Sequence, residues 1–250
     1  MQLPSSVHTR QGLSPVYKTG WVATLHPRFC PTTPTSSKDL NNPHLYSQSA
    51  LLNTMAPPFT ARLGSRDLSQ TATSSTKPPT SEQLVGQWYM TASSSSFWQD
   101  RKHSACLTYQ ASAATPGALD DVTTFFSDGS VQPSSTKGVS SPSAAGAGIY
   151  DWRGSGWLRM IRTSWEVVGW GVLGNDEGDD ELVLVTLAQK TMFSPPALSV
   201  YWRKKDGMGA ERIQAVSAAL KALGDANLAL DVDRLRVVPQ TGLAERETCV

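Results

Sequence analysis

Apolar and polar residues alternate over short runs from Gln87 into the C-terminal part of the chain. In the first run, Trp88, Met90 and Ala92 share one face, because successive side chains of a strand point to opposite faces. Short runs of this kind, separated by turn residues, are typical of an antiparallel all-β barrel. About eight are present, and they span residues 87–92, 105–111, 122–126, 149–153, 157–163, 165–173, 182–188 and 198–203.

The period changes after the last of these runs. Between Ala210 and Leu223 the apolar residues recur at three- and four-residue steps, which predicts an amphipathic helix that packs on the outside of the barrel. Gly224 stands where a glycine commonly ends a helix. Residues 235–238 are expected to add a last edge strand.

Two segments lack this patterning. Residues 1–80 are rich in Ser, Thr and Pro, and their only acids are Asp39 and Asp67. Such a composition buries too little apolar surface to offset the entropy of ordering, so we expect a disordered tail at 1–80 before a barrel domain at 81–250. It is also the composition of a transit peptide, and a start of the protein at Met55 is the alternative. Residues 133–148 are predicted to be an inserted or disordered loop.

The two ends of the patterned region carry recognisable motifs. The first strand opens on Gly86-Gln87-Trp88, and the strand at 198–203 ends in Arg203. A Gly-x-Trp first strand, a last barrel strand ending in arginine, a closing helix and a short final strand resemble the lipocalin family of the calycin superfamily. The order is nearest to the branch of apolipoprotein D and the bacterial outer-membrane lipocalin. The resemblance covers residues 81–250 and implies an eight-stranded antiparallel up-and-down barrel with the C-terminal helix outside.

The resemblance assigns structural roles to three residues. In a lipocalin the tryptophan after the first glycine closes the base of the barrel, and the terminal arginine lies across it; here these residues are Gly86, Trp88 and Arg203. A guanidinium stacked on an indole contributes up to about 2 kcal/mol when it is desolvated. The family's middle motif, Thr-Asp-Tyr, is represented at best by residues 174–176, Gly-Asn-Asp.

The resemblance also bears on the cysteines. In the apolipoprotein D branch, a cysteine at the start of the second strand pairs with one near the C-terminus, and Cys106 and Cys249 occupy similar positions. The alternative is two unpaired thiols, with Cys106 buried as a small apolar residue. No apolar stretch typical of a secretory signal follows Met1. The sequence does not decide between cytoplasmic, organellar and secreted locations.

A lipocalin-like barrel implies a cup that holds one small ligand. Residues of the first two strands, the loop between them and the aromatic-rich middle strands are expected to contact it, by alternation and by the resemblance. These candidate ligand-binding residues are Met90, Phe97, Trp98, Leu107, Tyr109, Trp152, Met160 and Trp165. We therefore expect binding and carriage of a small hydrophobic molecule. The alternatives are an isomerase or cyclase using Tyr109, Glu166 or Asp151 as its acid, and a barrel filled by its own aromatics.

Several other functions are excluded or disfavoured by the sequence. With 22 basic and 21 acidic residues the chain has no concentrated basic face for nucleic acid. No run approaches the roughly 20 apolar residues that span a bilayer. His103 is the only histidine of the patterned region, which argues against a multi-histidine metal site, and no cofactor is expected. Residues 169–174 read G-x-G-x-x-G but open no helix, so they predict no dinucleotide site. The oligomeric state stays open.

Overall fold

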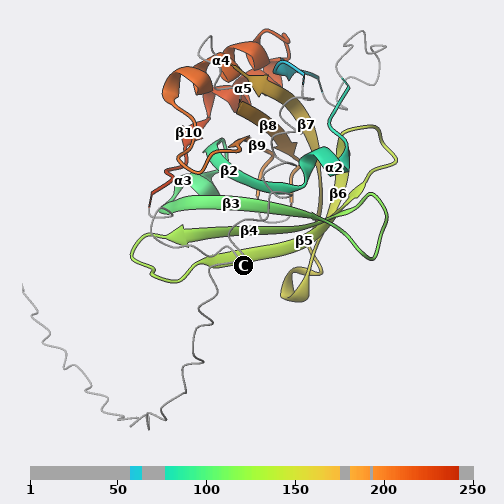
Figure 1. Cartoon of the computed structure of the whole chain (residues 1–250). Helices are drawn as coiled ribbons and strands as arrows, with labels where there is room; N and C mark the ends of the chain where they lie inside the picture. The colour runs from blue at the N-terminus through green and yellow to red at the C-terminus, as the bar shows by residue number, and fades with distance from the viewer. Residues whose placement is uncertain (1–56, 64–76, 175–180, 192–193, 242–250) are drawn as a thin grey trace, which may run out of the picture. The chain divides into compact units, whose positions relative to one another are not determined.

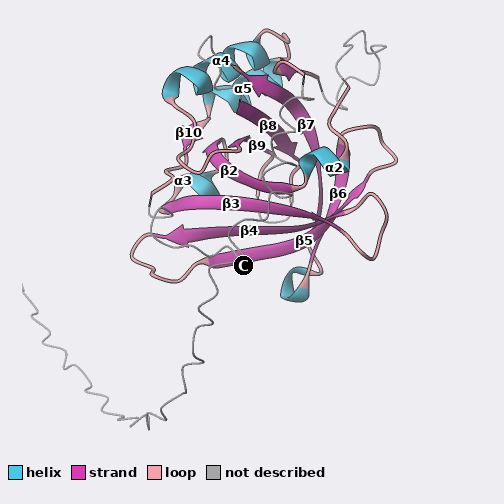
Figure 2. Cartoon of the chain, viewed as in Figure 1, coloured by secondary structure: helices cyan, strands magenta, loops and turns pink. Residues whose placement is uncertain are grey.

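Eight antiparallel strands close on themselves to form a barrel (Figures 1 and 2). Each strand pairs with the next one in the chain, and β9 returns to pair with β2. The strands are β2 (Gly86–Ser93), β3 (Lys102–Ala111), β4 (Leu119–Ser127), β5 (Ser134–Pro142), β6 (Ile149–Gly154), β7 (Arg162–Leu173), β8 (Glu181–Ala188) and β9 (Ala197–Trp202). The computed structural model describes residues 57–63, 77–174, 181–191 and 194–241. The predicted eight-stranded up-and-down barrel is thereby confirmed, and its architecture is lipocalin-like.

Strand β7 contributes to two apolar clusters, and its register with β8 shifts between Val167 and Gly169. Trp165, Val167 and Trp170 point into the barrel, where they join an interior cluster with Trp88. Val168 points outward into a second cluster, which lies between the barrel and the C-terminal helices. Successive residues of one strand thus supply both the cup and the surface that binds the helices.

An irregularity in β2 corrects the predicted face of Ala92. The pairing of β2 with β9 shifts register between Met90 and Ala92. Met90 therefore belongs to the interior cluster, as expected, whereas Ala92 belongs to the outer cluster. An extra residue in one strand reverses the faces of the residues that follow, and Thr91 is that residue here.

Two helices cover one side of the barrel, above β7, β8 and β9 in Figure 1. The first, α4 (Ala210–Lys221), is the predicted helix, and it buries Val216 and Leu220. The second, α5 (Ala226–Asp233), was not predicted. It starts where the Asp225 side chain accepts a hydrogen bond from the backbone N–H of Leu228, an ordinary N-cap contact. The expected edge strand follows as β10 (Arg236–Val237), which pairs with β2.

The sequence predicted the right number of strands but misassigned one of them. Residues 157–163 were expected to form a strand, yet 156–158 form a 3₁₀ turn and β7 begins only at Arg162. Residues 133–148 were expected to form a loop, yet β5 occupies 134–142 and pairs with β4 and β6. The glycine of this Ser-rich strand is explained by its neighbour, because the Trp152 indole lies directly over Gly138.

Part of the predicted tail belongs to the barrel. Strand β1 (Thr60–Ala61) pairs with β7 beyond the end of β6. Phe59 packs against the outer apolar cluster, and backbone atoms of 57–59 lie over Gly171, where a Cβ would meet the carbonyl oxygens of Pro57 and Pro58 at 2.6 Å. The residues assigned to the tail other than 57–63 and 77–80 lie outside the described part of the chain.

Two further short helices flank the barrel strands. Helix α2 (Ser81–Leu84) leads into β2 and carries a capping box between Thr80 and Gln83. Helix α3 (Ser96–Gln99) lies in the connection between β2 and β3. Within the residues that the structure describes, no helix is long and apolar enough to span a bilayer.

Candidate functional site

The base of the barrel is closed by a stacked pair. The Arg203 guanidinium lies 3.7 Å from the centre of the Trp88 ring, and Trp88 is fully buried. The guanidinium donates hydrogen bonds to the backbone oxygens of Gln83, Val85 and Gln87, at 3.2, 2.9 and 3.0 Å. Burial lowers the pKa of Arg203 to about 10, which leaves it charged at neutral pH. The pair therefore seals this end and lines no ligand space.

The glycine before this tryptophan has a specific steric role. Gly86 adopts φ +113°, a conformation that side chains with a Cβ rarely adopt. A Cβ at this position would also lie 2.6 Å from Nη1 of Arg203. The Gly-x-Trp motif thus lets the backbone pass close to the arginine that covers the tryptophan.

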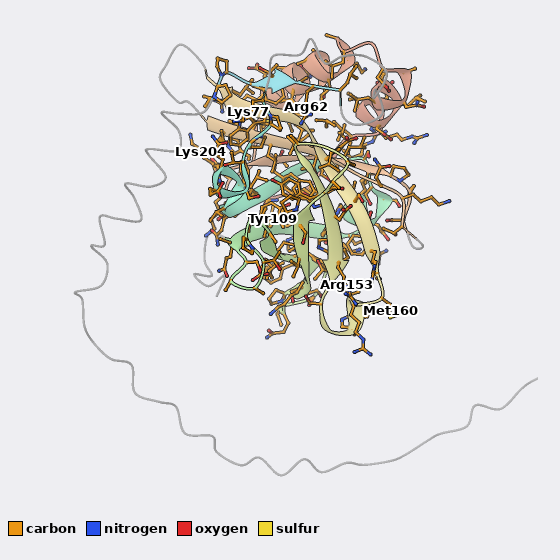
Figure 3. All side chains as sticks on the ribbon, turned by 90° about the vertical axis from the view of Figure 1, so that its right-hand side faces the viewer. Arg62, Lys77, Tyr109, Arg153, Met160 and Lys204 are labelled. Atoms are coloured by element: carbon orange, nitrogen blue, oxygen red, sulfur yellow. The ribbon has the colours of Figure 1, made fainter. Side chains whose placement is uncertain are left out.

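The opposite end of the barrel holds a cavity of about 390 Å³. The barrel wall supplies its inner lining, and the β2–β3, β6–β7 and β8–β9 connections supply the rest. Figure 3 shows Tyr109 near the middle of the barrel, away from the surface residues Arg153 and Met160. The lining residues that the argument uses are Phe97, Trp98, Tyr109, Asp121, Trp152, Trp165 and Tyr201.

Six of the eight predicted ligand-binding residues line this cavity. They are Phe97, Trp98, Leu107, Tyr109, Trp152 and Trp165. Met90 is buried in the interior cluster without being among the lining residues. Met160 is 84% exposed in the β6–β7 connection and does not line the cavity, which corrects the expectation for this residue. The prediction failed there because residues 157–161 form a projecting turn instead of a strand.

The aromatic lining forms two groups. Trp165 stacks between Tyr150 and Tyr109, with ring centres 4.4 and 5.9 Å away. At the other group, Phe97 and Trp98 of α3 meet Phe125 edge to face, at 5.7 and 5.2 Å. The first group forms a flat apolar wall, and the second holds α3 against β4.

A buried carboxylate sits in this aromatic wall. Asp121 is only 6% exposed, and it was not predicted as a site residue. Trp152 Nε1 donates to its Oδ1 and the Ser140 hydroxyl donates to its Oδ2, both at 2.9 Å. Trp165 Nε1 in turn donates to the Ser140 oxygen at 3.0 Å. One indole and one serine therefore donate directly to the carboxyl group, and the second indole donates to that serine.

The ionisation of the cup follows from burial. Burial raises the pKa of Asp121, while the hydrogen bonds from Trp152 and Ser140 oppose this increase. Burial also raises the pKa of Tyr109 well above its ordinary value, and the negative charge of Asp121 adds to the effect. For Tyr201, burial raises the pKa to about 12 despite hydrogen bonds to Ser199 and Thr186. Both tyrosines are therefore neutral hydroxyl groups at physiological pH.

The three titratable residues that the sequence suggested for catalysis, Tyr109, Asp151 and Glu166, lie in different places. Tyr109 lines the cavity. Asp151 is exposed and accepts a hydrogen bond from Ser164. Glu166 is buried on β7, where its electrostatic partner is Arg62. Asp121 could have been found by extending the run at 122–126 backwards, because Asp121, Thr123 and Phe125 then share one face.

The described residues cover only part of the predicted disulfide and of the predicted middle motif. Cys106 is buried on β3, while Cys249 lies outside the described residues, so the bridge between them stays a prediction. Most of the middle motif at 174–176 also lies outside them. Among the residues described, no three His, Cys, Asp or Glu side chains are placed to hold a metal ion.

Comparison with known proteins gives structural neighbours alone. No protein-family model matches the chain, and the curated proteins contain no match. Apocrustacyanin C1 is 14% identical, with 75% of this chain and 91% of that chain covered and a TM-score of 0.46. Lobster apocrustacyanin A1 is 14% identical, with coverages of 75% and 92% and a TM-score of 0.44. Apocrustacyanin C2 is 13% identical, with the same coverages and a TM-score of 0.45. The lipocalin-like fold of this chain follows from its own strand order and barrel closure.

Proposed function

We propose that this protein reversibly binds one small hydrophobic molecule in the cup of its barrel. The observation that carries the proposal is the 390 Å³ cavity, whose wall combines stacked aromatic rings with a few buried polar groups. This composition is typical of small-molecule sites, in which apolar burial supplies affinity and polar groups set orientation. The cavity volume also argues against a barrel filled by its own side chains.

The finer assignment extends this proposal. We assign the chain to the lipocalins nearest apolipoprotein D and the bacterial outer-membrane lipocalin, with the order of motifs from Gly86 to Arg203 as support. The biological role is carriage, in which the ligand enters and leaves through the end that α3 borders. Phe97 and Trp98 lie on this helix, and Phe97 is nearly half exposed, so a modest movement of α3 would open the cup.

Ligand binding should quench the tryptophan fluorescence, because Trp98, Trp152 and Trp165 all line the cavity. It should also carry a negative heat-capacity change, the most reliable sign of apolar burial. Titration with fatty acids, sterols, retinoids and aromatic metabolites, followed by calorimetry, measures both effects. Tyr109→Ala should weaken binding, while Asp151→Asn, which changes an exposed carboxylate outside the cavity, should leave it unchanged. A complete panel that produces no quench would refute binding as the main function.

One observation supports catalysis as the second candidate. Asp121 and Tyr109 are titratable side chains that are shielded from solvent and line the same cavity. An isomerase or cyclase acting on a lipophilic metabolite requires such a group as its acid. The two functions differ in the fate of the ligand. Recovery of unchanged ligand after long incubation supports binding, and conversion that stops with Asp121→Asn or Tyr109→Phe supports catalysis.

A further inference from the structure

The charge of the cavity is set by one side chain. Among the described residues that line it, Asp121 is the only acid, and none is Lys, Arg or His. The basic residues that the structure describes near this end, such as Arg153 and Arg162, lie on the outer surface. A carboxylate held in an apolar wall without a cation beside it is costly, unless a ligand supplies the positive charge or the missing hydrogen bonds.

The hydrogen bonds around Asp121 determine what else it can accept. Indole N–H groups are donors only, so Trp165 requires the Ser140 oxygen to act as an acceptor. The Ser140 hydroxyl hydrogen is then directed to Asp121, and the Trp152 N–H occupies one site on the other carboxylate oxygen. Each oxygen has a second lone pair. Both of the existing contacts stabilise the ionised form, which accepts hydrogen bonds and donates none.

The walls around this carboxylate favour a cation as well. The aromatic rings of Trp152, Trp165 and Tyr109 line the same cavity. The faces of such rings carry partial negative charge and attract ammonium groups, most strongly where water is excluded. An anionic ligand would instead meet the Asp121 carboxylate, and none of the described lining residues is a Lys, Arg or His that could offset the repulsion.

From these contacts we infer that the cup selects a hydrophobic ligand that carries a protonated amine, with the ammonium group bound at Asp121. This inference rests on the proposed binding function and specifies its ligand class. The apolar body of the ligand lies against the stacked Tyr109–Trp165 wall. The ammonium hydrogens bond to the free lone pairs of the Asp121 carboxylate.

A series of ligands with one aromatic body and different charges tests the inference. Suitable probes at pH 7 are 2-naphthylethylamine, 2-naphthylethanol and 2-naphthylacetic acid. The amine should bind about tenfold or more tightly than the alcohol, because hydrogen bonds between charged groups are roughly twice as strong as neutral ones. The acid should bind more weakly than the alcohol. Asp121→Asn should remove the preference for the amine and retain affinity for the alcohol, while the exposed Asp151→Asn should retain the preference.

The outcomes separate this inference from the proposed function. If the alcohol or the acid binds as tightly as the amine, the ammonium assignment is wrong and hydrophobic binding stands. The same holds if lipids of the wider panel bind and the amine does not. If neither the series nor the panel binds, both proposals fail. The comparison of ligands on the unaltered protein needs no variant, so a folding defect in Asp121→Asn cannot obscure it.

A different observation concerns the outside of the open end. Trp157 and Met160 project from the β6–β7 connection with 85% and 84% of their surface exposed. Arg153 and Arg162 are paired directly across β6 and β7, and both line an outer groove with Lys190. Like charges in directly opposite positions of a sheet are destabilising, so an anion bound at this groove would be favourable. Figure 3 shows Arg153 and Met160 together at the projecting end of these strands.

We propose that this projecting end docks on a bilayer that contains anionic lipid. Tryptophan and methionine enter the interface between headgroups and acyl chains, and the arginines contact the phosphates. Charge complementarity selects this partner, because Asp151 is the only acid among the described residues that line the groove. Docking here places the mouth of the cup against a source of hydrophobic ligands.

Vesicle sedimentation tests the docking. It compares phosphatidylcholine vesicles with vesicles that also contain roughly 30 mol% phosphatidylserine, whose anionic surface attracts basic groups. We expect binding only to the anionic vesicles, weakened by salt. Each of Arg153→Gln and Arg162→Gln should weaken it about fivefold. Trp157→Ala with Met160→Ala should also weaken it, while Leu230→Ala, which removes an exposed leucine of α5, should not. Equal binding to neutral vesicles, binding that all these variants retain, or no binding would overturn the proposal.

Discussion

Replacing Trp88 by alanine will lower the free energy of unfolding by about 3–5 kcal/mol, the range for truncating a large aromatic residue in a core. The indole is fully buried, lies 6.3 Å from the ring centre of Trp170 and donates to the Leu84 oxygen at 2.7 Å. Its removal leaves a cavity at the sealed end of the barrel and deprives Arg203 of its stacking partner. Urea unfolding followed by circular dichroism measures the loss. Trp157→Ala is the control, since an exposed tryptophan should contribute within about 0.5 kcal/mol.

The coupling between Trp88 and Arg203 follows from the same geometry. Arg203→Ala should also destabilise the protein, because the guanidinium donates to three backbone oxygens and stacks on the indole. Residues in contact are not additive, so the double variant should lose less than the sum of the single losses. Strictly additive losses would mean that the two side chains contribute independently, despite their contact.

The ends of the barrel could be predicted from the sequence because their residues act locally. The backbone at position 86 has a positive φ, which favours glycine. Trp88 and Met90, two residues apart on one strand, both point into the barrel. The helix at 210–221 is similarly visible in its own period. Such features depend on a few neighbouring residues, and the sequence displays them directly.

The middle of the barrel could not be predicted in this way, because its composition is set by contacts between strands. Residues 134–142 carry few apolar side chains, since two tryptophans from β6 and β7 fill the space in front of them. Trp157 and Met160 have the composition of a strand, yet β6 ends at Gly154 and Gly156 opens a turn that exposes both. Local propensity therefore assigned the strand to the wrong segment.

One essential residue of the candidate site, Asp121, was missed because its role depends on contacts between strands. The aromatic lining residues were visible as a concentration of tryptophan and tyrosine. Asp121, however, follows Asp120 in a segment that resembles a solvated turn, and Asp120 is indeed exposed. Alternation along β4 places Asp120 and Asp121 on opposite faces, but the hydrogen-bond partners of Asp121 on β5 and β6 are shown by no local pattern.

Gly138→Ala tests whether the small residues of β5 exist to accommodate the tryptophans. A Cβ at Gly138 would overlap the ring of Trp152, in particular Nε1 and Cε2. The indole must then move, which breaks its hydrogen bond to Asp121, and overpacking of this kind costs about 1–3 kcal/mol. We expect a lower urea midpoint and weaker ligand binding in the cup. Lys137→Ala, which changes the exposed neighbour on the same strand, is the matched control and should alter neither property.

The result discriminates between two accounts of this strand. If β5 only completes the barrel with its backbone, Ala is the better strand residue and Gly138→Ala should be neutral or stabilising. If β5 is shaped by the side chains in front of it, the added methyl group must disturb the Trp152–Asp121–Ser140 network. Unchanged stability together with unchanged ligand affinity would support the first account and would remove the steric explanation for the glycine at position 138. The variant could instead lose more ligand affinity than its lower stability accounts for. That result would show that the position of Trp152 sets the binding geometry of the cup.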